Sequence, residues 1–174
     1  MALRGRTARG LRALPVSTGT LAEARVARIE RVCSRLVLRS IRAFDERDWD
    51  GYARLFTPDG VFIRATDPQA PLVGRAAIRA ALAARPRTRL TRHLCTNIEI
   101  EVRDRDHAEG RCYLLLYGGD SSHPHSPEGR PAEPEQRVGE YRDQYVRTRE
   151  GWLIGQRAGT LVLYARSDHT GLAR

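Results

Sequence analysis

The chain has 174 residues, enough for one domain with a sizeable core but too few for two. It carries 30 basic residues against 21 acidic ones, a formal net charge of +9, and every basic residue is arginine. No apolar run approaches the roughly 20 residues that a membrane-spanning helix needs, so we expect no membrane partner.

The positive charge is not organised as a nucleic-acid-binding surface. Part of it lies in an N-terminal tail without acidic residues, at Arg4, Arg6, Arg9 and Arg12. Most of the other arginines alternate with carboxylates, as on a solvated surface. The complete absence of lysine indicates biased codon usage rather than selection for phosphate contacts. We therefore expect no nucleic-acid partner.

The three cysteines, Cys33, Cys95 and Cys112, lie in apolar segments, and their number is odd. No two of them have the close spacing of a zinc site. We predict buried free thiols, which are typical of a cytoplasmic protein. His123 and His125 are two potential metal ligands, but no third ligand accompanies them in their loop, so no metal is expected.

The first half of the chain reads as helical. Residues 1–20 are expected to form a disordered tail. An amphipathic helix follows from about Leu21 to Phe44, with apolar residues at i, i+3/i+4 and i+7. A short helix is predicted over 49–56, and then a turn over 57–60 and a short strand over 61–63. A third helix over 75–84 is stopped by Pro86.

After Pro86 the helical period gives way to strands, predicted over 89–103, 108–118, 138–148 and 152–165. A long mobile loop is expected over 118–136, which is rich in Pro, Gly, Ser and Glu. Residues 167–174 are expected to form a C-terminal tail. Helices followed by an antiparallel meander indicate a single α+β domain over 21–166, in which a curved sheet packs against the N-terminal helices.

One predicted strand carries a histidine that has a candidate carboxylate partner. At period 2, His93, Cys95 and Asn97 share one face, and Leu94, Ile98, Ile100 and Val102 the other. Asp45 ends the long helix. If that helix packs across the sheet, Asp45 meets His93, whose imidazole can act as an acid or base near neutral pH. The alternatives are a buried structural histidine and a carboxylate that answers a backbone amide.

Four segments of the chain form a set by their order and spacing. They are Phe44-Asp45-Glu46-Arg47-Asp48-Trp49 with Leu55-Phe56-Thr57-Pro58-Asp59-Gly60; Val73-Gly74-Arg75-Ala76-Ala77-Ile78; Arg92-His93-Leu94-Cys95-Thr96-Asn97; and Gly139-Glu140-Tyr141-Arg142-Asp143 with Gly151-Trp152-Leu153-Ile154 and Arg157. Together they resemble the SnoaL-like domains of the nuclear-transport-factor-2-like superfamily, which includes scytalone dehydratase and ketosteroid isomerase. The resemblance implies a cone-like α+β barrel with a pocket between the curved sheet and the helices.

For function, the resemblance implies cofactor-free acid–base chemistry on a small hydrophobic carbonyl or polycyclic compound, such as a polyketide- or steroid-like molecule. Asp45 and His93 fall on the catalytic positions of the dehydratase-like members. Those members also hold a tyrosine just before the aspartate or about one turn earlier, where this chain has Phe44 and Ser40. Isomerisation, cyclisation or an altered dehydration are thus the expected reactions.

Six further residues are expected to bind substrate: Asn97, Tyr113, Trp49, Tyr52, Phe62 and Tyr141. Packing is the alternative for the aromatic ones. Asp143 is expected to form a cross-strand ion pair with Arg157 rather than to act as an acid. We also expect a homodimer formed through the open face of the sheet.

Two other interpretations stay open. The β subunits of ring-hydroxylating dioxygenases share this fold and a similar stretch around Arg87–His93, which would make the chain a non-catalytic assembly subunit. A ligand-binding module without turnover is the third interpretation.

Overall fold

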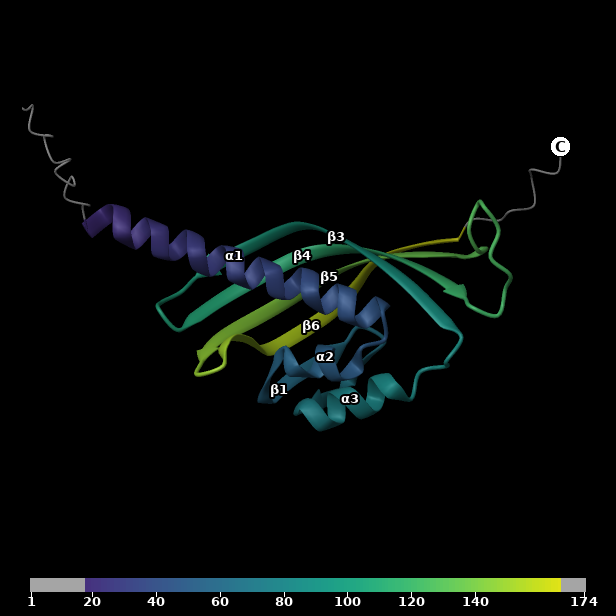
Figure 1. Cartoon of the computed structure of the whole chain (residues 1–174), viewed down its shortest axis with the longest axis horizontal. Helices are drawn as coiled ribbons and strands as arrows, with labels where there is room; N and C mark the ends of the chain where they lie inside the picture. The colour runs from purple at the N-terminus through teal and green to yellow at the C-terminus, as the bar shows by residue number, and fades with distance from the viewer. Residues whose placement is uncertain (1–17, 167–174) are drawn as a thin grey trace, which may run out of the picture.

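The computed structural model describes residues 18–166 and contains three helices and six strands within them (Figure 1). The predicted tail over 1–20 lies outside this range except for its last three residues, which begin the first helix, and the tail over 167–174 lies outside it. In chain order the elements are α1 (Thr18–Asp45), α2 (Trp49–Arg54), β1 (Phe56–Arg64), β2 (Asp67–Val73), α3 (Arg75–Ala83), β3 (Arg89–Val102), β4 (His107–Asp120), β5 (Ala132–Thr148) and β6 (Gly151–Arg166).

The six strands form one mixed, curved sheet in the order β2-β1-β6-β5-β4-β3. β1 runs parallel to β6, and all other neighbours are antiparallel. Helix α1 crosses the concave face, while α2 and α3 lie together below it next to β1 (Figure 1). The predicted α+β fold with N-terminal helices against a curved sheet is confirmed.

Helix α1 buries the apolar stripe that predicted it. Its core residues recur at helical spacing: Ile29, Cys33, Leu36, Val37, Ile41 and Phe44. The helix ends at Asp45, and Arg47 then adopts a left-handed conformation (φ 61°) that redirects the chain. Asp48 caps α2, because its carboxylate accepts a hydrogen bond from the Gly51 amide at 2.8 Å. This reversal holds Asp45 at a fixed place over the sheet.

Two stretches that the sequence analysis assigned to turns and loops belong to strands. β1 runs through the predicted turn at 57–60, and β2 was not predicted at all. Pro68 and Pro71 weaken its strand pattern, yet they are tolerated because β2 is an edge strand paired only with β1. The predicted loop over 118–136 is shortened to residues 121–131 by the extension of β4 and β5.

The predicted alternation along β3 is wrong beyond Thr96 because a β-bulge changes its phase. The register with β4 shifts between Thr96 and Glu99, and Asn97 has a positive φ of 51°. As a result Ile98, Ile100 and Val102 pack against the same core as Cys95, instead of lying opposite to it. Leu94 is 53% exposed on the outer face.

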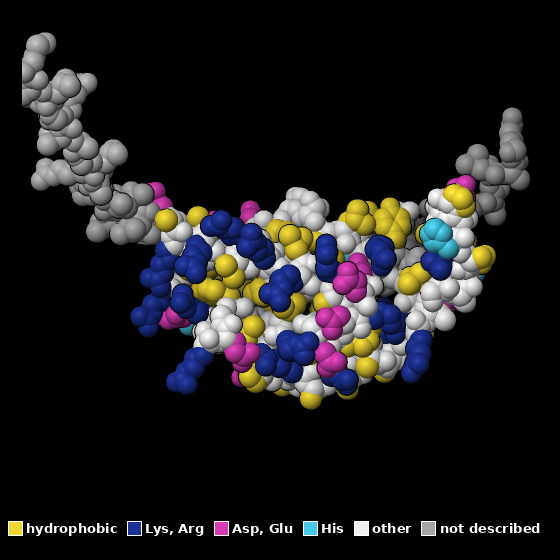
Figure 2. Space-filling model, in the orientation of Figure 1, with side chains coloured by type: hydrophobic (Ala, Val, Ile, Leu, Met, Phe, Trp, Pro, Cys, Tyr) yellow, Lys and Arg dark blue, Asp and Glu magenta, His cyan; other side chains and the backbone are white. Residues whose placement is uncertain are grey.

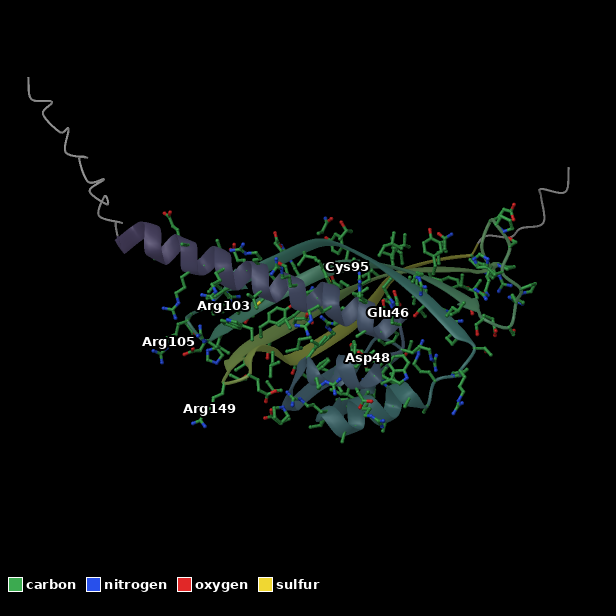
Figure 3. All side chains as sticks on the ribbon, viewed as in Figure 1. Glu46, Asp48, Cys95, Arg103, Arg105 and Arg149 are labelled. Atoms are coloured by element: carbon green, nitrogen blue, oxygen red, sulfur yellow. The ribbon has the colours of Figure 1, made fainter. Side chains whose placement is uncertain are left out.

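The arginines are spread over the surface and mixed with carboxylates. Figure 2 shows acidic side chains between the basic ones on the face in view. Ion pairs such as Arg79–Asp50, at 2.6 Å, and Arg111–Glu99 join them. Arg103, Arg105 and Arg149 lie at the hairpin turns, at the far end of the sheet from the 121–131 segment (Figure 3). No helix within residues 18–166 is long and apolar enough to cross a membrane.

Candidate functional site

Asp45 and His93 are in direct contact. The His93 Nδ1 atom lies 2.6 Å from Asp45 Oδ1, and the His93 backbone amide donates to Asp45 Oδ2 at 2.9 Å. The Thr91 hydroxyl donates to Oδ1 at 2.8 Å. The carboxylate is therefore held by three donors, all from β3, and the imidazole is held in turn. The predicted contact between the end of α1 and this strand is confirmed.

This arrangement fixes which ring nitrogen of His93 carries hydrogen. An ionised carboxylate accepts hydrogen bonds but cannot donate them, so Nδ1 must be the protonated nitrogen. In the neutral imidazole Nε2 then keeps its lone pair, and Nε2 bonds to no residue that the structure describes. Burial acts to raise the pKa of Asp45, but the hydrogen bonds and charge of His93 and the Thr91 hydroxyl outweigh it and lower that pKa. Asp45 is thus ionised at neutral pH.

The imidazole borders a cavity that is partly open to solvent. The two side chains of the pair are only 8% and 10% exposed, and His93 lines a cavity of about 410 Å³ between the sheet and the helices. Phe44 meets the imidazole edge-on, with ring centroids 5.1 Å apart. Phe62, Leu82, Leu114 and Leu116 also line the cavity, and its volume suits a molecule of two or three rings.

A second histidine–aspartate contact shows why the cavity matters. His107 Nδ1 lies 3.0 Å from Asp104 Oδ2 in the β3–β4 turn, where both side chains are more than half exposed. Neither His107 nor Asp104 lines the 410 Å³ cavity. Of these two contacts within residues 18–166, the Asp45–His93 pair is the one that combines burial with a space for a ligand.

A buried polar cluster lies beneath the cavity. Arg157 is fully buried and makes a bidentate ion pair with Asp143, at 2.8 and 2.6 Å. The Tyr145 hydroxyl donates to the same carboxylate at 2.7 Å, and Arg157 also donates to Ser40 Oγ at 2.6 Å. The predicted cross-strand pair Asp143–Arg157 is confirmed. The Tyr145 and Ser40 hydroxyls satisfy most of the remaining hydrogen-bonding capacity of this ion pair, so we assign the pair a structural role.

Of the six predicted substrate-binding residues, the structure places Tyr141 and Phe62 in the cavity wall. The Arg157 guanidinium lies over the Tyr141 ring at 4.3 Å and fixes its position. The Tyr141 hydroxyl makes no hydrogen bond with any described residue. Burial raises the pKa of Tyr141, and the charges of Tyr52 and Asp143 raise it further, so the phenol stays protonated and can donate.

The other four do not line this cavity. Asn97 lies at the bulge, exposed, where its side chain accepts from Thr96 Oγ1 at 3.0 Å. Tyr113 lies on the outer face and is 51% exposed, because it falls out of phase with the buried Cys112 and Leu114. Trp49 packs edge-on against Phe44, and Tyr52 is buried in the aromatic core with Phe56 and Phe62. For Asn97, Tyr113, Trp49 and Tyr52, substrate binding therefore stays a prediction that the lining of this cavity does not support.

Sequence reasoning missed several polar residues of the cavity wall. Thr91, Arg89 and His93 share one face of β3 before the bulge, so the same period-2 argument would have found the first two. Three more arginines line the cavity: Arg64 from β1, Arg85 from the connection between α3 and β3, and Arg137 from β5. No local pattern marks these three, because they come together only through the sheet order.

No cluster of three or more potential metal ligands exists among residues 18–166. The three cysteines are free, with Cys33 and Cys112 buried and Cys95 partly so. Cys95 lies where α1 passes over β3 (Figure 3). The site thus consists of an oriented imidazole, a phenol and a rim of arginines around an apolar cavity.

The fold corresponds to a known class. Residues 25–158 match the SnoaL-like domain, and the chain belongs to this family. No protein with curated annotation is matched by the sequence.

Solved structures share the fold at low sequence identity. A putative scytalone dehydratase from Novosphingobium aromaticivorans is 20% identical, with a TM-score of 0.69 over 83% of this chain and 91% of that one. An NTF2-like protein with a cystatin-like fold from the same organism is 21% identical, with a TM-score of 0.65 over 84% and 90%. A type 2 hexachlorocyclohexane dehydrochlorinase (LinA) is 17% identical, with a TM-score of 0.65 over 84% and 97%.

Proposed function

We propose that this protein is an enzyme that moves a proton on a small hydrophobic carbonyl or polycyclic compound, with His93 as the proton carrier and Asp45 as its positioning partner. The observation that carries the proposal is the buried Asp45–His93 contact at the wall of an apolar cavity. Membership of the SnoaL-like family agrees with this assignment, since two structural neighbours are named as a dehydratase and a dehydrochlorinase.

The chemistry follows from the tautomer. His93 Nε2, with its lone pair toward the cavity, takes a proton from the carbon next to a carbonyl group, and the imidazolium that forms is stabilised by Asp45. The electrons of the C–H bond move onto the carbonyl oxygen, where the Tyr141 hydroxyl can donate a hydrogen bond. In a conjugated dienolate, return of the proton from His93 to the far carbon completes an isomerisation. Where the enolate carbon instead attacks a second carbonyl, the proton passes from His93 to the oxygen of that carbonyl and completes a cyclisation.

Dehydration by the arrangement of the dehydratase-like members fits less well. Phe44 offers no hydroxyl for water, and the Ser40 hydroxyl is already bonded to the Val37 carbonyl and Arg157. Isomerisation and cyclisation need no such group and are favoured here.

Deuterium exchange tests the proposal without knowledge of the natural substrate. A bicyclic ketone such as 2-tetralone is incubated with the enzyme in D2O, and α-deuteration is followed by NMR. We expect exchange by the wild type and its loss in His93→Ala. His107→Ala is the matched control, because it removes the exposed histidine–aspartate contact. Undiminished exchange by a folded His93→Ala variant would refute the catalytic role.

An apolar row on the outer face of the sheet is an exposed surface that a partner chain can cover, which is a homodimer partner here and a different protein in the assembly-subunit alternative. Leu94, Leu115, Val138 and Leu163 pair directly across β3, β4, β5 and β6, and Leu94 and Leu163 are 53% and 63% exposed. We propose that this face forms a homodimer. Light scattering should give twice the monomer mass for the wild type and the monomer mass for the double variant Leu94→Glu with Leu163→Glu. A wild-type chain that is monomeric alone and associates only with a different protein would favour the assembly subunit.

A further inference from the structure

The wall of the cavity that holds His93 is strongly basic. Arg64, Arg85, Arg89 and Arg137 line it, from four different segments of the chain. Glu140 is the one carboxylate among the lining residues, and it accepts hydrogen bonds from the Arg142 guanidinium, at 3.1 and 3.3 Å. The cavity wall therefore has a net positive charge, although its other surfaces are largely apolar.

Two of these four arginines already have acidic partners. Arg64 pairs with Asp67 at 2.5 Å, and Arg89 pairs with Glu133. Arg85 and Arg137 have no acidic partner within residues 18–166. The Arg85 guanidinium lies over the Phe44 ring at 5.0 Å. Burial lowers the pKa of Arg85, and the charges of Arg89 and Arg47 lower it further. A bound anion would relieve this crowding of positive charge.

The register of the sheet sets the distance between this charge and the proton carrier. His93 pairs with Leu116, and Leu116 pairs with Arg137, so all three lie in one row on the concave face. Two strand spacings separate His93 from Arg137, roughly 10 Å. Arg137 thus lies about the length of two fused rings from His93. Arg85 lies at the same end of the cavity as Phe44, whose ring contacts both the Arg85 guanidinium and the imidazole.

We propose, on the basis of the function proposed above, that the substrate carries a carboxylate on an aromatic or polycyclic frame, and that Arg85 and Arg137 bind this carboxylate. A carboxylate presents two coplanar oxygens that match the paired donors of a guanidinium. The apolar wall accommodates the rings, and the fixed distance places the far end of the frame at His93 Nε2. Arg85 and Arg137 thereby select acidic substrates and orient them for proton transfer.

Calorimetric titration with three bicyclic probes tests this inference directly. 2-Naphthoate carries the carboxylate, 2-naphthamide is its neutral counterpart of the same shape, and 2-naphthyl phosphate carries a larger anion. We expect the wild type to bind naphthoate about tenfold to hundredfold more tightly than naphthamide, as hydrogen bonds to a charged group allow. The preference should weaken as salt rises from about 50 to about 500 mM.

The variants Arg85→Gln and Arg137→Gln should each reduce this preference, and the double variant should abolish it, while naphthamide binding changes little. Arg87→Gln and Arg147→Gln are the matched controls, because both arginines are exposed and lie outside the cavity wall. Equal binding of naphthoate and naphthamide, or binding of neither, would overturn the inference. Tighter binding of naphthyl phosphate than of naphthoate would overturn the assignment of a carboxylate.

The test separates this inference from the proposed function. His93→Ala should keep the preference for naphthoate within about threefold, because His93 does not contact the carboxylate in this arrangement. A retained preference with no effect of His93→Ala on deuterium exchange would leave the anion site standing without the catalytic role. Exchange that depends on His93, with no preference for naphthoate, would refute the anion site alone.

Discussion

Replacement of Asp45 by asparagine should reverse the tautomer of His93. The carboxylate accepts from the Thr91 hydroxyl and His93 Nδ1 on one oxygen and from the His93 amide on the other. An asparagine has one oxygen and one NH2 group to meet these donors. If its NH2 group faced the backbone amide, two donors would meet, and neither can change its role. The oxygen therefore turns toward the backbone amide.

The asparagine NH2 group then faces Nδ1 and Thr91. The Thr91 hydroxyl can rotate to accept, but Nδ1 can accept only if the imidazole hydrogen moves to Nε2. The cavity nitrogen thus changes from a proton acceptor into a donor. We expect α-proton exchange to fall by about 10²–10⁴-fold, as for the loss of a general base, while the free energy of unfolding falls by about 1–3 kcal/mol.

NMR correlation of the imidazole nitrogens with the ring protons measures the tautomer directly. It is recorded at about pH 9, where histidine is neutral, and His93 is assigned with the His93→Ala variant. Wild type should show hydrogen on Nδ1, and Asp45→Asn should show it on Nε2. Hydrogen on Nδ1 in both proteins would refute this account of the site.

The pH dependence of stability gives a second readout of the same pair. Burial opposes ionisation of Asp45, but the hydrogen bonds from His93 and Thr91 prevail, so its pKa lies below the ordinary 3.8. A carboxylate with a lowered pKa stabilises the native state above its unfolded pKa, and this stabilisation is lost as the pH falls through the folded pKa. The difference in unfolding free energy between wild type and Asp45→Asn should therefore be constant above about pH 5 and shrink below about pH 4. A difference that grows on acidification would contradict the direction of the shift.

Other predictions concern the core, the thiols and the tail. Asp143→Ala leaves the Arg157 guanidinium buried without its partner, so urea denaturation should show a fall in the free energy of unfolding of about 3–5 kcal/mol. A fall below about 1 kcal/mol would disprove the burial of this pair. Burial, together with the charge of Asp143, raises the pKa of Cys33 to about 12, so mass spectrometry after iodoacetamide treatment should find the partly exposed Cys95 alkylated well before Cys33. Removal of residues 1–17 should sharply reduce retention on heparin, whereas tight, salt-sensitive DNA binding by the remaining chain would refute the expectation of no nucleic-acid partner.

The sequence predicted the Asp45–His93 contact because both residues lie at positions that local rules define. Asp45 follows directly on the apolar stripe of α1, and His93 lies four residues into β3, before the bulge. A helix of that length must cross the sheet to bury its stripe, and its last turn then meets the middle of an outer strand. Helix end and strand phase were sufficient here.

The same rules failed where the backbone departs from regular geometry. The bulge at Asn97 reverses the alternation of β3, and nothing in the sequence around it is specific for a positive φ. Strand phase also did not show that Tyr113 lies on the outer face, because the face of each strand that turns toward the cavity depends on the register. Arg137 and Arg85 could not be assigned to the cavity from the sequence, because β5 and the α3–β3 connection are brought to the same cavity by the order of the strands in the sheet, which no local pattern reveals.

Of the two positions where this chain departs from the dehydratase pattern, Ser40 and Phe44, Ser40 is connected to the cavity phenol Tyr141 through Arg157. Ser40, one helical turn before Phe44, is committed to the buried Arg157–Asp143 pair through its hydrogen bond with Arg157. Arg157 in turn lies over the Tyr141 ring and holds this phenol in the cavity wall. The helix position that carries a tyrosine in the dehydratase-like members thus supports, in this chain, a tyrosine on the opposite wall. A phenol in that place faces the substrate from the sheet, where it can stabilise a developing enolate oxygen, but it does not replace a water-binding group beside the aspartate. Under the proposed function, the Tyr141 phenol, the His93 imidazole and the two arginines that have no acidic partner within residues 18–166 would favour enolisation of an acidic bicyclic or polycyclic ketone over elimination of water.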